Sequence, residues 1–192
     1  MKKYLCFAII VILFIGYDFI KTYSLFESNI VTPSQISLAN WEVSVNDTLV
    51  GKNTSFNVDN IVWDESIYVI DGKAAPGRTG HFNISIKPNT TQVAYRYDIT
   101  IQDSSIFELV SVKTSDGTSL KKTDENTYSA VVTLDDIDNG TISDVQVDIM
   151  WNNVESNNEL DTSMSENRET IVIPVSIHFS QYLGEELVEY VG

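Results

Sequence analysis

Strict alternation of apolar and polar residues is the feature that most limits what this chain can fold into. A period of two places one face of a strand in a core and the other in water, as in antiparallel sheets. The alternation therefore predicts an all-β fold. The apolar members of the runs are Trp41, Val43 and Val45; Phe82, Ile84 and Ile86; Val93, Tyr95, Tyr97, Ile99 and Ile101; Val145, Val147, Ile149 and Trp151; and Ile171, Ile173, Val175, Ile177 and Phe179.

Turn signals separate these runs at intervals typical of a sandwich. They include Asp71-Gly72, Pro76-Gly77, Asp116-Gly117 and Asn139-Gly140. Their spacing predicts eight or nine strands forming a single antiparallel β-sandwich over residues 41–192. The one helical turn expected after the N-terminal segment lies around residues 134–137.

Two segments interrupt the strand pattern. Residues 25–40 mix polar and apolar side chains around Pro33 and are predicted to form an arm ahead of the sandwich. Residues 152–169 are polar and acidic and are predicted to form a long loop. Pro174 lies within a strong strand pattern, which favours an edge strand or a bulge. An edge would matter because unpaired strand edges recruit other strands.

The N-terminus carries an export segment. Lys2 and Lys3 precede an unbroken apolar and aromatic run from Tyr4 to Tyr17, whose 14 residues suit the core of a signal peptide. A spanning helix prefers about 20 residues. Residues 1–24 are therefore predicted to be a signal that signal peptidase cleaves between Ser24 and Leu25. The alternative is an uncleaved helical anchor that crosses the membrane through residues 4–20, with the N-terminus inside.

Charge and cysteine content exclude several classes of protein. A net charge of −15 argues against a nucleic-acid partner, because phosphate binding needs clustered Lys and Arg. Cys6 is the only cysteine, so the chain has no intramolecular disulfide and no cysteine-rich metal site. An exported domain of this kind draws its stability from its core and its sheet pairing.

The residues offer no recognisable catalytic set. His81 and His178 are the only histidines, and the sequence has no zinc-binding or nucleophile motif around them. We therefore expect no catalytic residue, no cofactor and no enzyme activity. The sharpest alternative is calcium, because Glu155, Glu159 and Asp161 in the acidic segment carry the oxygen ligands that calcium prefers. Their spacing does not match an EF-hand, and such residues are more often simply solvated.

Several short stretches resemble the TasA and camelysin group of exported Gram-positive β-sandwich proteins. They are residues 22–28, 39–46, 75–84 and 95–99, of which the Pro-Gly-x-x-Gly-x-Phe piece from Pro76 to Phe82 is the most specific. The cleavage residue is Ser24 where that group has alanine, and the 152–169 segment has no counterpart. The resemblance implies a secreted, jelly-roll-like sandwich that assembles into biofilm-matrix fibres. It also implies that the arm, with Phe26, Ile30 and Ile36, completes the sheet of the next subunit.

These observations predict an extracellular or cell-surface structural protein. Its partners would be further copies of itself or other matrix and surface proteins. The main alternative is a monomeric surface-binding module held at the membrane by an uncleaved anchor, with calcium as a candidate ligand. A secreted hydrolase comes last, because no nucleophile, base or metal set can be assembled.

Overall fold

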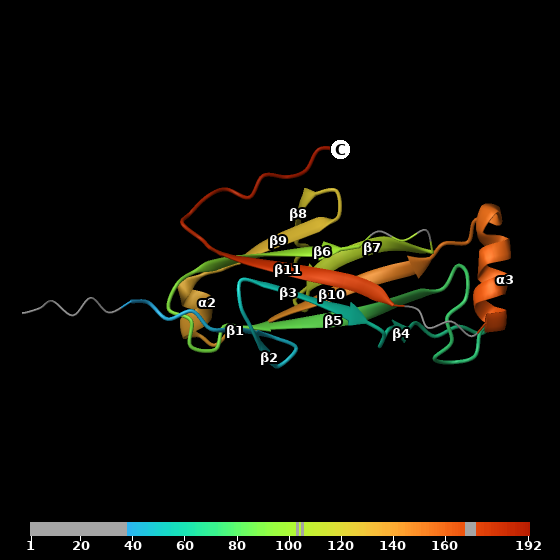
Figure 1. Ribbon diagram of the computed structural model, residues 1–192, viewed down its shortest axis with the longest axis horizontal. Helices are drawn as coiled ribbons and strands as arrows, with labels where there is room; N and C mark the ends of the chain where they lie inside the picture. The colour runs from blue at the N-terminus through green and yellow to red at the C-terminus, as the bar shows by residue number, and fades with distance from the viewer. Residues whose placement is uncertain (1–37, 103, 105, 168–171) are drawn as a thin grey trace, which may run out of the picture. The chain divides into compact units, whose positions relative to one another are not determined.

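The computed structural model describes residues 38–102, 104, 106–167 and 172–192. These residues form eleven strands, two α-helices and one 3-10 turn (Figure 1). In chain order the elements are β1 (Val43–Val45), β2 (Thr48–Val50), β3 (Asn53–Val58), β4 (Val62–Trp63), β5 (Thr79–Lys87), β6 (Tyr95–Ile101), β7 (Phe107–Thr114), β8 (Lys121–Asp124), β9 (Thr127–Val132), α2 (Leu134–Asp138), β10 (Ser143–Trp151), η1 (Glu155–Asn157), α3 (Asn158–Asn167) and β11 (Ile173–Gln181).

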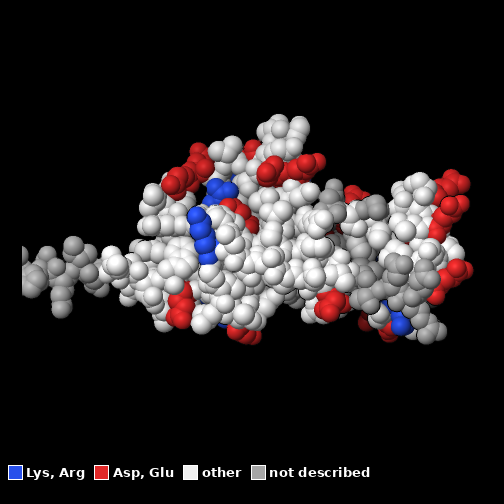
Figure 2. Space-filling view, in the orientation of Figure 1, with Lys and Arg blue, Asp and Glu red and all other residues white. Residues whose placement is uncertain are grey.

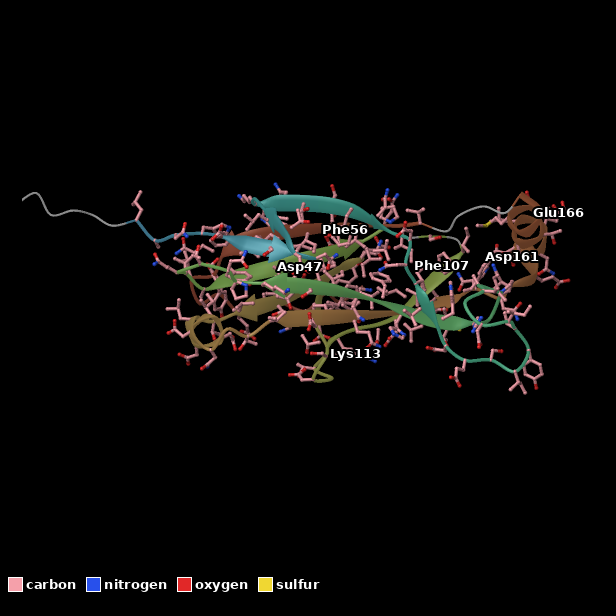
Figure 3. The ribbon with its side chains drawn as sticks, turned by 90° about the horizontal axis from the view of Figure 1, so that it is seen from below. Asp47, Phe56, Phe107, Lys113, Asp161 and Glu166 are labelled. Atoms are coloured by element: carbon pink, nitrogen blue, oxygen red, sulfur yellow. The ribbon has the colours of Figure 1, made fainter. Side chains whose placement is uncertain are left out.

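The strands form two antiparallel sheets that pack face to face. Sheet A has the order β2-β1-β5-β10-β7, with β4 also paired to β5, and sheet B has the order β3-β11-β6-β9-β8. Figure 3 shows the two sheets as stacked layers, with Phe56 of β3 in one layer and Lys113 on the outside of the other. The predicted all-β class and two-sheet packing are therefore confirmed.

The core consists of the apolar residues that the alternating sequence pattern predicts to face inward. Every second residue of β5, β6, β10 and β11 is buried between the sheets, and Tyr95, Ile99, Val145 and Phe179 are completely inaccessible to solvent. Because these strands are central in their sheets, their inward faces form one continuous hydrophobic cluster. Burial of this apolar surface is the main force that holds the sheets together.

The strand count exceeds the prediction because several strands are very short. β2 and β4 contain three and two residues, too few for an alternating pattern to be recognised. The turn expected near residues 134–137 is confirmed as α2, where Thr133 and Asp136 form a capping box.

The prediction of a long loop over residues 152–169 is wrong. Within this segment η1 is followed by α3, which lies across one end of the strands (Figure 1). Glu159 and Asp161 occupy the first helical turn, where negative charge complements the helix dipole. Only Leu160 and Met164 supply apolar side chains at helical spacing, so the amphipathic signal in the sequence is weak.

The expectation that Pro174 marks an edge strand or a bulge is also wrong. Pro174 is the second residue of β11, which lies between β3 and β6 and pairs with β3 in unbroken register. The Pro174 carbonyl accepts a hydrogen bond of 3.0 Å from the Gln102 amide, one residue beyond the end of β6. Pro174 lies opposite Gln102, one residue beyond β6, so its missing N–H removes at most the last hydrogen bond at the end of the ladder with β6.

The Pro76–Phe82 stretch has a local structural role. Pro76 and Gly77 form the centre of a turn closed by the Arg78 amide and the Ala75 carbonyl, and Gly77 takes the positive φ of 79° that such a turn requires. The Arg78 side chain is buried and donates to the backbone carbonyls of Asp64, Ile70 and Lys73. One guanidinium thus holds the loop between β4 and β5 in place.

Candidate functional site: an unprotected sheet edge

Strand edges are the places where this sandwich could bind another chain through its backbone. The main order of sheet A ends in β2 and β7, and that of sheet B ends in β3 and β8; β4, which pairs with β5 outside this order, has only two residues. Natural sheets protect such edges with short strands, bulges, charged residues or covering segments. The four edges differ in how many of these protective features they have.

Three of the edges are protected. β2 has only three residues. The β7 edge is covered in its second half by the following loop, whose Leu120 amide donates to the Val112 carbonyl, and its pairing with β10 contains an irregularity. β8 carries Lys121, Lys122 and Asp124, has a bulge, and accepts a hydrogen bond of 2.9 Å from Tyr190 in the C-terminal segment.

Within the residues that the structure describes, the β3 edge has none of these features. Its six residues, Asn-Thr-Ser-Phe-Asn-Val, contain no charge and no proline, and β3 pairs with β11 without a register shift. Among the described residues β11 is the sole partner of β3. This strand is therefore the edge most open to pairing with an additional strand.

The orientation of the β3 backbone follows from its hydrogen bonds. The Phe179 amide of β11 donates to the Lys52 carbonyl at 2.8 Å, so even-numbered residues in this stretch face β11. In an antiparallel pair the N–H and C=O of one residue point to the same neighbour. The backbone groups of Asn53, Ser55 and Asn57 therefore point toward the open edge.

The core is incompletely covered beneath this edge. Phe56 points inward and packs against the hydrophobic cluster, yet it stays only partly buried. Thr54, two residues earlier on the same face, is likewise partly buried. A strand added beside β3 would place alternate side chains over this margin of the core, and apolar side chains there would bury more of Phe56.

The root of the predicted arm is fixed to the domain at Asn40. The Asn40 amide donates to Gln92 Oε1 at 2.9 Å, and the Gln92 amide donates back to the Asn40 carbonyl at 2.9 Å. Trp41 makes an edge-to-face contact with Tyr95 of the core, with ring centroids 5.8 Å apart. Residues from Asn40 onward therefore belong to the folded domain, and the residues before Leu38 lie outside the described part of the chain.

Most residues predicted for export and assembly fall outside the described ranges. Ser24 and Leu25 at the expected cleavage site, and Phe26, Ile30 and Ile36 of the arm, all precede Leu38. These assignments stay predictions. In the part of the chain that the structure does describe, no helix is long and apolar enough to cross a membrane.

The predicted calcium residues lie on neighbouring short elements. Glu155 is in η1, while Glu159 and Asp161 are in the first turn of α3 (Figure 3 labels Asp161). Asp161 Oδ1 accepts a hydrogen bond of 2.9 Å from Trp151 Nε1, which attaches the helix to the end of β10. Across residues 38–167 and 172–192, apart from 103 and 105, no three His, Cys, Asp or Glu side chains are grouped to hold a metal ion. Calcium binding stays a prediction.

The two histidines lie on different sheets and have separate partners. His81 is in β5 of sheet A, where its Nδ1 is 3.7 Å from Asp64 Oδ1. His178 is in β11 of sheet B and its Nδ1 is 2.6 Å from Asn53 Oδ1. Neither contact presents a nucleophile to a base.

Sequence reasoning did not single out the β3 edge. The alternation of Thr54, Phe56 and Val58 is visible in the sequence, but alternation does not say whether a strand is central or at an edge. The absence of charge and proline over residues 53–58 is the one local signal that could have suggested an unprotected edge.

Comparisons with protein families, with curated proteins and with solved structures found no match to this chain.

Proposed function

We propose that this chain is an exported, non-enzymatic structural protein, a subunit of a cell-surface or biofilm-matrix fibre that assembles by strand addition. Residues 1–24 direct export and are cleaved by signal peptidase after Ser24. The freed arm, residues 25–37, pairs with the β3 edge of the next subunit. In this proposal the domain is a jelly-roll-like sandwich of the TasA and camelysin kind.

The observation that carries the proposal is the unprotected β3 edge above a partly exposed Phe56. An extended peptide gains main-chain hydrogen bonds at such an edge, and its alternate side chains fill the margin of the core. Phe26, Ile30 and Ile36 are all even-numbered, so an extended arm would present them on one face. In a register that turns this face toward the core, the three side chains would lie on the same side of the sheet as Phe56.

The length of the arm is sufficient for contact with another molecule. Fully extended, the residues from 25 to 37 span about 40 Å at roughly 3.3 Å per residue. The β3 edge needs only six paired residues. The arm can therefore leave its own domain at Leu38 and still cover the whole edge of a neighbour.

The first test removes the donor. Deletion of residues 25–37 from the exported protein should abolish fibres in electron micrographs while the circular dichroism spectrum of the sandwich is retained. The deletion stops before Leu38 because Asn40 is hydrogen-bonded to the loop before β6. Fibres formed by the deleted protein would exclude the arm as donor.

The second test blocks the acceptor. Ser55→Pro removes an N–H that points to the open edge, so it should prevent strand addition without breaking the ladder to β11. Leu49→Pro is the matched control, because Leu49 is at the open edge of β2 in sheet A and its N–H also faces outward. Ser55→Pro should abolish fibres and Leu49→Pro should leave them unchanged; the reverse pattern would overturn the choice of β3.

Mixing the two defective proteins gives a third readout. The arm-deleted chain keeps an intact edge, and the Ser55→Pro chain keeps an intact arm. Together they should form 1:1 dimers, measured by sedimentation, and no fibres.

Signal cleavage is tested separately. N-terminal sequencing of the exported protein should give Leu25 as its first residue. Recovery of membrane-bound monomers alone would instead favour the anchored surface-binding module.

A further inference from the structure

The outer face of sheet B contains a hollow that is independent of the strand edge. A groove of about 460 Å³ runs across β3, β11 and β6, and Ser55, Asn57, Thr100, Gln102, Pro174 and Ser176 are among its lining residues. Figure 1 shows these three strands side by side on the face toward the viewer.

The groove arises from the sizes of the residues on the central strand. Pro174 and Ser176 point outward from β11 and are small, so the floor is low. The walls come from the strands on either side, with Asn57 on β3 and Gln102 just beyond the end of β6. Two amide side chains thus face one another across a floor of one hydroxyl and one proline ring.

The described lining carries no charge and combines hydroxyl and amide groups with apolar surface from Pro174, Phe56 and Val175. None of the described residues that line it is Asp, Glu, Lys or Arg, and Figure 2 shows most charged side chains of this face away from its centre. The hydroxyls and amides provide both donors and acceptors. Thr100 Oγ1 lies 2.9 Å from Thr127 Oγ1 and keeps further hydrogen-bonding capacity, because a hydroxyl offers one donor and two acceptor positions.

These features select the class of ligand. Among the described lining residues, an anion would meet no cation, within a protein of net charge −15, and a cation would meet no carboxylate. An extended peptide pairs through its backbone, whereas the backbone groups of β11 are already engaged with β3 and β6. An uncharged sugar chain has hydroxyls for the side chains of the walls and C–H faces for the ring of Pro174.

We infer that this groove binds a neutral oligosaccharide. The assignment does not depend on fibre assembly, because the groove faces outward from the sheet whereas strand addition uses the backbone edge of β3. A fibre with this property would hold uncharged polysaccharide along its length through one groove in each subunit.

The test is a titration of the full chain with cellotetraose, chitotetraose and mannotetraose, followed by amide chemical shifts. At least one sugar should produce saturable shifts at Asn57, Thr100, Gln102 and Ser176. Ser176→Tyr fills the floor and should weaken binding at least tenfold, while Asn83→Tyr on the exposed face of β5 serves as the matched control and should not.

Several outcomes would overturn the inference. They are the absence of shifts with all three sugars, shifts confined to other surfaces, equal binding by the Ser176→Tyr protein, and tighter binding of an anionic oligogalacturonate or of a neutral extended peptide. Because Ser176 is on an interior strand, fibre formation by Ser176→Tyr should be normal. Loss of sugar binding and loss of assembly are therefore separately observable.

Discussion

Trp63 packs against Gly80 where β4 pairs with the start of β5. A Cβ atom at Gly80 would lie 2.8 Å from Trp63 Cε3 and 2.9 Å from the Val62 carbonyl oxygen. The register pairs Trp63 with Gly80 directly, so the two-residue strand β4 approaches the sheet closely only because residue 80 has no side chain.

Gly80→Ala should therefore destabilise the sandwich. The added methyl group displaces β4 and the Trp63 ring, and overpacking of this kind costs about 1–3 kcal/mol. Gly51→Ala is the control, because no atom lies within 4 Å of a Cβ there and Gly51 does not have a positive φ. Urea denaturation should show a lower free energy of unfolding for Gly80→Ala and an unchanged or slightly higher one for Gly51→Ala. Equal values for the two would show that β4 moves freely.

Removing the hydroxyl group should change the free energy of unfolding in opposite directions at two tyrosines of β6. The Tyr95 hydroxyl is buried and has no hydrogen-bond partner within the described residues, whereas Tyr97 forms a side-chain hydrogen bond with Ser143. Burial raises the pKa of Tyr97 to about 12, more than the bond to Ser143 lowers it, so the hydroxyl stays protonated at neutral pH. Burial is likewise the main cause of the raised pKa of Tyr95.

Tyr95→Phe should raise the free energy of unfolding by about 1 kcal/mol, because it removes a buried group that lost its water without gaining a partner. Tyr97→Phe should lower it by a similar amount, about 1 kcal/mol, because a hydrogen bond is lost. Thermal and urea denaturation of both proteins check the contrast. A destabilised Tyr95→Phe protein would mean that the hydroxyl of Tyr95 is satisfied.

Much of the fold is readable from the sequence, and the alternation explains why. Val145, Val147, Ile149 and Trp151 are correctly assigned to the core because a strand places every second residue on the same face. The position of a strand within its sheet, in contrast, cannot be predicted from alternation. Pro174 suggested an edge, but it lies opposite Gln102, where the ladder with β6 ends, so it removes at most a terminal hydrogen bond. Where that ladder ends depends on the neighbouring strand rather than on residue 174.

Neither helix α3 nor the candidate site could be predicted from the sequence, and the reasons are related. The contacts of α3 include a hydrogen bond from Trp151 to Asp161 and the burial of Met164, and the helix has no long apolar stripe. The openness of β3 is a property of the whole sheet order, which pattern reading cannot supply. Local signals thus predict which residues face inward, whereas edges and grooves require the assembled sheets.

Arg78 should be needed for order in the loop between β4 and β5. Its guanidinium reaches three separate carbonyl groups, on Asp64, Ile70 and Lys73. Lysine cannot reproduce this forked geometry, so Arg78→Lys should lower the free energy of unfolding by about 2 kcal/mol. Hydrogen exchange over residues 64–73 should accelerate. Arg96→Lys, at a partly exposed residue on the outer face, should have a smaller effect and leave this loop unchanged.

Asp148 should make the stability of the sandwich depend on pH in the acid range. Burial disfavours its charged form, but hydrogen bonds from Lys113, Ser111 and Gln146 and the charge of Lys113 outweigh that effect and lower the pKa from 3.8 to about 2. Its side chain is 22% exposed, so solvent screens the interactions only partly. The folded state therefore binds this proton more weakly than the unfolded state does.

The sign follows from that difference in proton binding. The stabilisation is fully present above a pH of about 4 and is lost as the pH falls toward 2; for this shift it amounts to about 2 kcal/mol. Asp148→Asn should therefore destabilise the protein at pH 6 and have little effect at pH 2. Asp144→Asn, at an exposed position of the same strand, removes the same charge and controls for the general relief of repulsion in an acidic protein. Denaturation curves for the three proteins from pH 2 to pH 7 provide the measurement, and a difference between Asp148→Asn and the unmodified protein that does not vary with pH would contradict the assignment.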